Sequence, residues 1–134
     1  SVVDFASIGT NDLSQYTMAA DRMQGALSDL LSPWQPAVLQ MIKATCLGGD
    51  ATGKPISVCG EAGGDPLLAL VLVGLGVTSL SMAPSRVGAV RAALRSHDID
   101  TCRQMANFAV DARTARDARE AVLALADPVL KDLL

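Results

Sequence analysis

The sequence predicts an α/β fold with a small parallel sheet, and three observations lead to this class. Short apolar segments rich in β-branched residues recur along the chain, and each is followed by a longer segment that favours a helix. Glycine or proline marks most boundaries between the two kinds of segment. Half of the 134 residues are hydrophobic but only 3% are aromatic, so the core must be built from aliphatic side chains. Strands that alternate with helices pair in parallel, and the helices cover the sheet.

The first strand is predicted at residues 2–8, which form a short apolar run that ends at Gly9. Residues 9–12 have the composition of a loop, because Gly, Asn and Asp favour turns. One or two helical turns are expected at residues 13–20. An irregular connection should follow at residues 21–33, which contain glycine, proline and several serines.

A longer helix is predicted to begin near Pro36, because proline suits the first helical position, where an N–H group would have no partner. Between residues 38 and 45, apolar residues recur three and four positions apart, so one face should be buried. Gly53 is expected to cap the carboxyl end of this helix. The pair Gly48-Gly49 weakens the prediction for its last turns.

The second strand is predicted at residues 56–59 and leads into a glycine-rich loop at 60–64. Asp65 and Pro66 then provide an N-cap and a first-turn proline. The helix that they open should cover residues 67–75 and end at Gly76.

A third strand is predicted at residues 78–82, followed by a helix at 86–95 that Pro84 and Ser85 open. Two further helices are expected at about 101–110 and 116–125. The order is β-α-β-α-β-α with a helical tail. We therefore divide the chain into residues 1–95, an α/β portion, and residues 96–134, a helical tail of the same domain.

Composition limits the classes of function. The net charge of −3 and a pI near 4.9 argue against a nucleic-acid-binding surface. No apolar run approaches the roughly 20 residues that cross a bilayer, so no membrane insertion is expected. The three cysteines have no paired spacing, which indicates reduced thiols in a cytoplasmic protein.

Polar residues that could bind a ligand follow the first predicted strand. Asn11 can donate hydrogen bonds to an anion, and Asp12 offers a hard oxygen ligand for Mg²⁺. In parallel α/β folds the carboxyl ends of the strands are where sites are built. A turn without a function is the alternative for this segment.

Arg22 and Cys59 complete the candidate set. The guanidinium of arginine matches the geometry of phosphate and carboxylate, although a lone surface arginine is usually only solvated. Cys59 ends the second strand and could be a nucleophile, an acid, a redox thiol or an inert buried residue. No histidine is near it in sequence, which favours a protonated thiol that acts as an acid.

The remaining histidine, cysteines and charged run are predicted to have no part in a site. His97 lies in a polar stretch and is expected to be solvated. Cys46 and Cys102 fall within predicted helices and are expected to be packing residues. The charged run at residues 111–120 alternates in sign, which is typical of a solvated helix face.

Four segments in this order resemble Enzyme I, the phosphoenolpyruvate–protein phosphotransferase family of the bacterial sugar phosphotransferase system. They are DFASIGTNDLSQYTMAADR at 4–22, PAVLQMIK at 36–43, GKPISVCGEAGGDP at 53–66 and LVGLGVTSLSMAPSRVGAVR at 72–91. The resemblance covers about residues 2–95. It implies a partial (β/α)₈ (TIM) barrel that binds phosphoenolpyruvate: about the last three β/α units plus the helical tail.

The resemblance also implies roles for the candidate residues. Asn11 and Arg22 would contact the phosphate of phosphoenolpyruvate, and Asp12 would bind Mg²⁺ at the same substrate site. Cys59 would be the general acid that protonates the enolate carbon as pyruvate forms. These residue types suit the reaction, because phosphoryl transfer needs charge neutralisation and the enolate then needs a proton donor.

The resemblance places the remaining machinery outside this sequence. The phosphoryl group would pass from phosphoenolpyruvate to a histidine of another domain and then to the histidine-containing phosphocarrier protein. His97 lies in no matching motif. The chain alone is therefore expected to be an inactive fragment, and its open strand edges should favour a homo-oligomer.

Two alternative interpretations remain open, and one residue differs from the pattern of the family. The segment CGEAGGDP also resembles pyruvate phosphate dikinase and phosphoenolpyruvate synthase, whereas QYTMAADR favours Enzyme I. A non-catalytic binding or oligomerisation module is the second alternative. Met23 follows Arg22 where the family usually has glycine, so the turn at this point is expected to differ.

Overall fold

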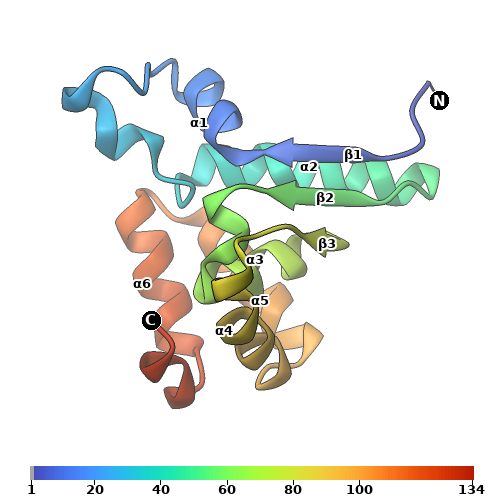
Figure 1. The fold of residues 1–134 in the computed structure, drawn as a ribbon, viewed down its shortest axis with the longest axis vertical. Helices are drawn as coiled ribbons and strands as arrows, with labels where there is room; N and C mark the ends of the chain where they lie inside the picture. Colours follow the sequence, from blue (N-terminus) through green and yellow to red (C-terminus); the bar gives the residue numbers. More distant parts are fainter. Residues whose placement is uncertain (1) are drawn as a thin grey trace.

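The computed structural model describes residues 2–134, and Ser1 lies outside the described residues. The strands and helices, in order, are β1 Ala6–Gly9, α1 Thr10–Met18, α2 Pro36–Thr52, β2 Ile56–Cys59, α3 Pro66–Leu75, β3 Ser79–Leu80, α4 Pro84–Arg95, α5 Ile99–Asp111 and α6 Ala115–Leu125 (Figure 1). Three short 3₁₀ segments are η1 Gly25–Leu31, η2 Glu61–Gly64 and η3 Pro128–Asp132. The predicted α/β class is confirmed.

The three strands form one parallel sheet in the order β1-β2-β3. Ile8 lies opposite Val58, and Val58 lies opposite Leu80. Ile8 and Val58 are buried, whereas Ser57 between the buried positions of β2 is only half-buried. Because side chains alternate across a strand, Cys59 shares the less buried face with Ser57.

Helix α3 lies at the centre of the core. Residues 67–72 are all 0% exposed, as expected for a helix that is hydrophobic all round. Helices α2, α4, α5 and α6 pack around it, and Figure 1 shows α4, α5 and α6 grouped on the side away from β1. Met105, Val122 and Leu130 of the carboxyl-terminal part belong to the same buried cluster. The tail therefore completes the core around α3.

Local signals set the boundaries as predicted for the central helices. Asp65 accepts hydrogen bonds from the N–H groups of Leu67 (2.9 Å) and Leu68 (3.3 Å), so it caps α3. Gly53 ends α2 with φ at 64°, in the left-handed region that glycine enters without strain. The helix runs through Gly48-Gly49 without a break, because tertiary packing outweighs their low helix propensity.

The outer strands are shorter than predicted. β1 begins at Ala6, where the N–H group bonds to the carbonyl of Pro55 and pairing with β2 starts. Val2 and Phe5 before it are exposed. β3 covers only Ser79–Leu80 of the predicted 78–82. The N–H groups of Thr78 and Ser81 still donate to the carbonyl oxygens of Ile56 (2.8 Å) and Val58 (2.9 Å), so hydrogen bonding to β2 extends one residue beyond β3 at each end.

The structure corrects two predictions for the carboxyl-terminal part. His97 is half-buried rather than solvated: its Nε2 accepts from the N–H of Asp127 (3.0 Å), and its Nδ1 lies 2.8 Å from the carbonyl oxygen of Ala93. It therefore links the end of α4 to the start of η3. The charged side chains at 111–120 are exposed as predicted, but they do not form one helix face, because Thr114 caps a new helix within the run. No helix among residues 2–134 combines the length and apolar character needed to cross a bilayer.

Candidate functional site

The candidate residues lie at the carboxyl ends of β1 and β2. Helix α1 starts at Thr10, directly after β1, so Asn11 and Asp12 lie exposed in its first turn rather than in the predicted loop. Thr10 is buried, and its hydroxyl donates to the carbonyl oxygen of Cys59 at 3.4 Å. This bond joins the ends of the two strands.

Asn11 also faces the end of β2. A methyl group placed on Gly60 would lie 4.0 Å from Nδ2 of Asn11 and 3.5 Å from the hydroxyl of Thr10. Gly60 has φ at 96° and ψ at −167°, a conformation that side-chain-bearing residues rarely adopt. Glycine is therefore required at this position by the sharp turn after Cys59, since a Cβ there would only make ordinary contact with Thr10 and Asn11.

Cys59 is half-buried, and its thiol donates to the carbonyl oxygen of Ile8 at a sulfur–oxygen distance of 3.5 Å. The donor role requires the protonated thiol. The side chain lies on the less buried face of the sheet, where Cα of Cys59 is paired with Gly9. The thiol thus lies at the end of β2, one strand away from the segment that carries Asn11 and Asp12.

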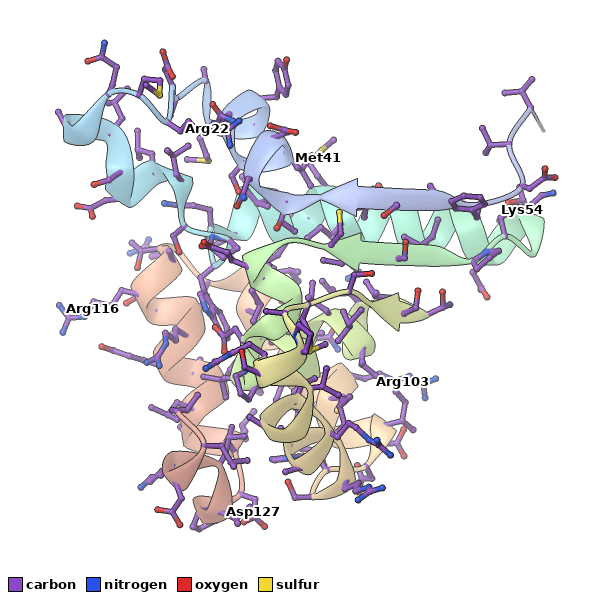
Figure 2. The ribbon with its side chains drawn as sticks, viewed as in Figure 1. Arg22, Met41, Lys54, Arg103, Arg116 and Asp127 are labelled. Carbon is purple, nitrogen blue, oxygen red and sulfur yellow. The ribbon has the colours of Figure 1, made fainter. Side chains whose placement is uncertain are left out.

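The chain turns back at Ala19, after α1, so that Arg22 lies beside this helix. Ala19 follows α1 with φ at 50°, and it is the one residue other than glycine with positive φ among residues 2–134. The turn brings Nη2 of Arg22 to 3.9 Å from Oδ1 of Asp12. Both side chains are more than half exposed, and such pairs add little to folding stability. Figure 2 shows Arg22 beside α1, at the carboxyl end of β1.

The turn around Arg22 does not need the glycine that Met23 replaces. The N–H of Met23 donates to Oδ1 of Asp21 (2.9 Å), and the N–H of Gln24 donates to the carbonyl of Asp21 (3.1 Å). Met23 has no positive φ, so a side chain at this position causes no strain. The aspartate-centred turn explains why the departure from the family pattern is tolerated.

The side chains of this region line a small pocket of about 400 Å³. Its lining consists of Asp12, Gln15, Tyr16, Ala19, Ala20, Asp21 and Arg22. A second pocket of about 790 Å³ opens at the ends of β2 and β3 and includes Gly60, Glu61, Arg86 and Arg119. The structure therefore brings Asp12 and Arg22 into one pocket, whereas Asn11 and Cys59 line neither pocket.

Asp12 is suited to a divalent cation as one ligand among several. Within residues 2–134 no three acidic, histidine or cysteine side chains gather in a way that could hold a metal ion. Mg²⁺ commonly takes one or two carboxylates and completes its shell with water and substrate phosphate. One exposed carboxylate fits that pattern as a partial site.

Sequence reasoning missed Gln15. Its Nε2 donates to Oδ1 of Asp12 (3.3 Å), and its Oε1 accepts from the N–H of Arg22 (3.3 Å). The first contact could be found from the spacing, because residues three apart are neighbours on a helix. The second exists only because the chain turns back after α1.

Comparison with known proteins identifies the family of this chain. The model of the family described as "PEP-utilising enzyme, PEP-binding domain" matches residues 1–99. The chain therefore belongs to the family of PEP-utilising enzymes.

Several named phosphotransfer proteins are similar to most of this chain. The chain is 50% identical over 123 residues to the phosphoenolpyruvate-protein phosphotransferase of Streptomyces coelicolor, which is 92% of this chain and 22% of that protein. It is 42% identical over 118 residues to the protein of the same name from Latilactobacillus sakei, 88% of this chain and 21% of that protein. A multiphosphoryl transfer protein of Escherichia coli is 39% identical over 126 residues, 94% of this chain and 15% of that protein. The chain spans between 15% and 22% of the length of these relatives.

Proposed function

We propose that residues 1–95 form the last three β/α units of a PEP-binding (β/α)₈ barrel and that residues 96–134 are a helical tail of the same domain. The strand order supports a barrel, because three parallel strands neighbour one another in chain order. Open doubly wound sheets instead reverse their order at the ligand site. Each outer strand pairs only with β2 within the described chain, which leaves an edge on either side for further strands.

The parent activity that fits this chain is that of Enzyme I. Phosphoenolpyruvate would give its phosphoryl group to a histidine of the same enzyme, and the histidine-containing phosphocarrier protein would then take it for sugar uptake. The observation that supports the proposal is that Asp12 and Arg22 line one pocket beyond the carboxyl end of β1, while Cys59 ends the neighbouring strand β2. The histidine and the remaining barrel strands would come from other parts of the parent, so the chain alone would be inactive.

The roles follow from the chemistry of each group. Arg22 and Asn11 would donate hydrogen bonds to the phosphate oxygens and offset their charge. Asp12 would hold Mg²⁺, which neutralises charge on the phosphoryl group when it is bound. The exposure of Asp12 and Arg22 suits this use, because their pairing gives the fold little and leaves their polar atoms open to a ligand.

Cys59 would act after the phosphoryl group has left. The bond between phosphorus and the enol oxygen breaks, and its electron pair stays on the enolate. The enolate carbon then takes the thiol proton of Cys59, which gives pyruvate and a thiolate that solvent reprotonates. The hydrogen bond of the thiol to the carbonyl oxygen of Ile8 would orient the Cys59 side chain before that step.

We further propose that the parent enzyme is cytoplasmic and that this chain by itself forms a homo-oligomer. The edges of β1 and β3, which further barrel strands would cover in the parent, are open to a second copy in the chain alone, since unpaired strand edges attract further strands.

Binding and chemistry can be tested separately in the full-length protein that contains this chain. Arg22→Ala should weaken phosphoenolpyruvate binding about tenfold to a hundredfold in calorimetric titration with Mg²⁺, because hydrogen bonds to charged groups contribute about 1.5–3 kcal/mol. Arg116→Ala is the matched control, since Arg116 pairs with Glu120 on α6 and points away from the molecule in Figure 2. Equal binding by both variants would refute the assignment of Arg22.

Cys59→Ala should still bind phosphoenolpyruvate but should form pyruvate slowly. In deuterated water, the wild-type protein should incorporate deuterium at the methyl carbon of pyruvate at its turnover rate. Unchanged turnover and incorporation in Cys59→Ala would show that another group donates the proton.

A further inference from the structure

Gln15 connects two groups of the proposed site through the two ends of one amide. It lies on α1, one turn after Asp12, and its Nε2 donates to Oδ1 of that carboxylate at 3.3 Å. Its Oε1 accepts from the backbone N–H of Arg22 at 3.3 Å. No other side chain among residues 2–134 is recorded with a hydrogen bond to both of these residues.

The orientation of this amide is fixed by its partners. A carboxylate accepts hydrogen bonds only, and a backbone N–H donates only. A flipped amide would set its oxygen against the carboxylate of Asp12 and its NH₂ group against the N–H of Arg22. The observed orientation is the one that satisfies both ends.

The backbone of Gln15 holds the same turn. The N–H of Ala20 donates to the carbonyl oxygen of Gln15 at 3.0 Å, and Ala19 takes up its left-handed conformation beside it. The backbone bond fixes where the chain leaves α1, and the side-chain bond fixes where Arg22 returns. Without the side chain, the turn would still reverse the chain, but the position of Arg22 relative to Asp12 would be free to vary.

The ion pair cannot set this position by itself. Nη2 of Arg22 and Oδ1 of Asp12 are 3.9 Å apart, and the two side chains are 59% and 70% exposed. Exposed ion pairs of this kind are weak and mobile. Gln15 adds a second link, because its two hydrogen bonds join the carboxylate of Asp12 to the backbone from which the Arg22 side chain extends.

We propose that Gln15 is a positioning residue that sets the distance between the phosphate-binding Arg22 and the metal-binding Asp12. The inference rests on the proposed function of these two residues. It gives Gln15 no contact with substrate, and its effect passes through its neighbours.

The test uses Gln15→Met in the full-length protein, because methionine keeps the length of the side chain and removes both hydrogen bonds. The KM for phosphoenolpyruvate and the Mg²⁺ concentration for half-maximal activity should each rise about tenfold, the lower range for loss of a group that orients a ligand. The kcat should change less, since Arg22 and Asp12 hold their ligands before and during the reaction. Gln24→Met is the matched control: Gln24 is exposed, and its side chain makes no capping bond.

A double variant separates positioning from general destabilisation. In an Arg22→Ala background the turn has no guanidinium to place, so Gln15→Met should raise the KM for phosphoenolpyruvate much less than in the wild type. Full additivity of the two effects would overturn the inference. The inference would also be overturned if Gln15→Met and Gln24→Met had equal KM values while Arg22→Ala was impaired. In that case the proposed function of Arg22 would still stand. If Arg22→Ala itself bound phosphoenolpyruvate normally, the proposed role of Arg22 would fail, and the positioning role would fail with it.

Discussion

The close crossing of α3 and α5 predicts that Gly74→Ala destabilises the chain. A Cβ on Gly74 would overlap the carbonyl oxygen of Cys102 and would lie 2.5 Å from its carbonyl carbon and 2.9 Å from the nitrogen of Arg103. All three obstacles are backbone atoms of α5, which cannot rotate away as a side chain could. Ordinary contact begins at 3.4 Å, so the carbonyl carbon alone requires the helices to separate by about 0.9 Å, and the overlapping carbonyl oxygen requires more.

The magnitude follows from two opposing effects. Overpacking a core costs about 1–3 kcal/mol, and a rigid backbone obstacle puts this position at the upper end. Alanine is favoured over glycine inside a helix by about 1 kcal/mol. We therefore expect Gly74→Ala to lower the free energy of unfolding by about 2 kcal/mol.

Gly88→Ala is the matched control, because Gly88 lies inside α4 and a Cβ there would meet no atom within 4 Å. This variant should gain about 1 kcal/mol from helix propensity alone. Urea unfolding followed by far-ultraviolet circular dichroism measures both. With a slope of about 2 kcal/mol per M, the midpoint should fall by about 1 M in Gly74→Ala and rise by about 0.5 M in Gly88→Ala.

One result would refute the reasoning about the crossing. If Gly74→Ala gained stability to the same extent as Gly88→Ala, with an unchanged slope, α3 and α5 would not approach as closely as the structure shows. A change in the slope alone would indicate an altered denatured state and would call for a second probe of unfolding.

Two further predictions concern thiols and an acidic cap. Burial raises the pKa of the Cys46 and Cys102 thiols and shields them from reagents, so iodoacetamide should label Cys59 first in the folded chain. Labelling is measured by mass spectrometry, and equal labelling of all three cysteines would contradict this prediction. The hydrogen bond from the backbone N–H of Thr101 (2.7 Å) lowers the pKa of Asp98, so the stability that this carboxylate adds is present at neutral pH and is lost as the pH falls through its lowered pKa. Asp98→Asn keeps a capping side chain without titrating, so the wild type should lose stability relative to it in acid unfolding curves; parallel curves would refute the assignment.

Much of the fold follows from local signals. Pro36 and Pro66 stand in the first turns of α2 and α3, and Gly53 and Gly76 cap their ends, as the sequence predicts. These residues act through their own backbone preferences and through hydrogen bonds to positions two to four residues away. Such effects do not depend on the rest of the structure, so they can be recognised in the sequence.

The sequence predicted the individual residues of the candidate site but not their arrangement in space. Asn11, Asp12, Arg22 and Cys59 stand in segments with a recognisable order, and their roles remain proposals. Their neighbourhood could not be predicted in the same way. Gln15 belongs to it because the turn at Ala19 reverses the chain, and nothing local in the sequence specifies where Arg22 returns.

The sequence by itself determined the α/β class, the approximate elements and the residue types that suit an anionic substrate and a cation, because strand and helix periodicity and capping chemistry act over short distances. Only the tertiary structure decided where pairing begins and ends in β1 and β3, since a strand exists only where a neighbour accepts its hydrogen bonds. It also decided that His97 bonds to Asp127 rather than to water, across 30 residues of chain. Contacts of that kind depend on how the other helices pack around α3, and this packing involves residues from the whole chain.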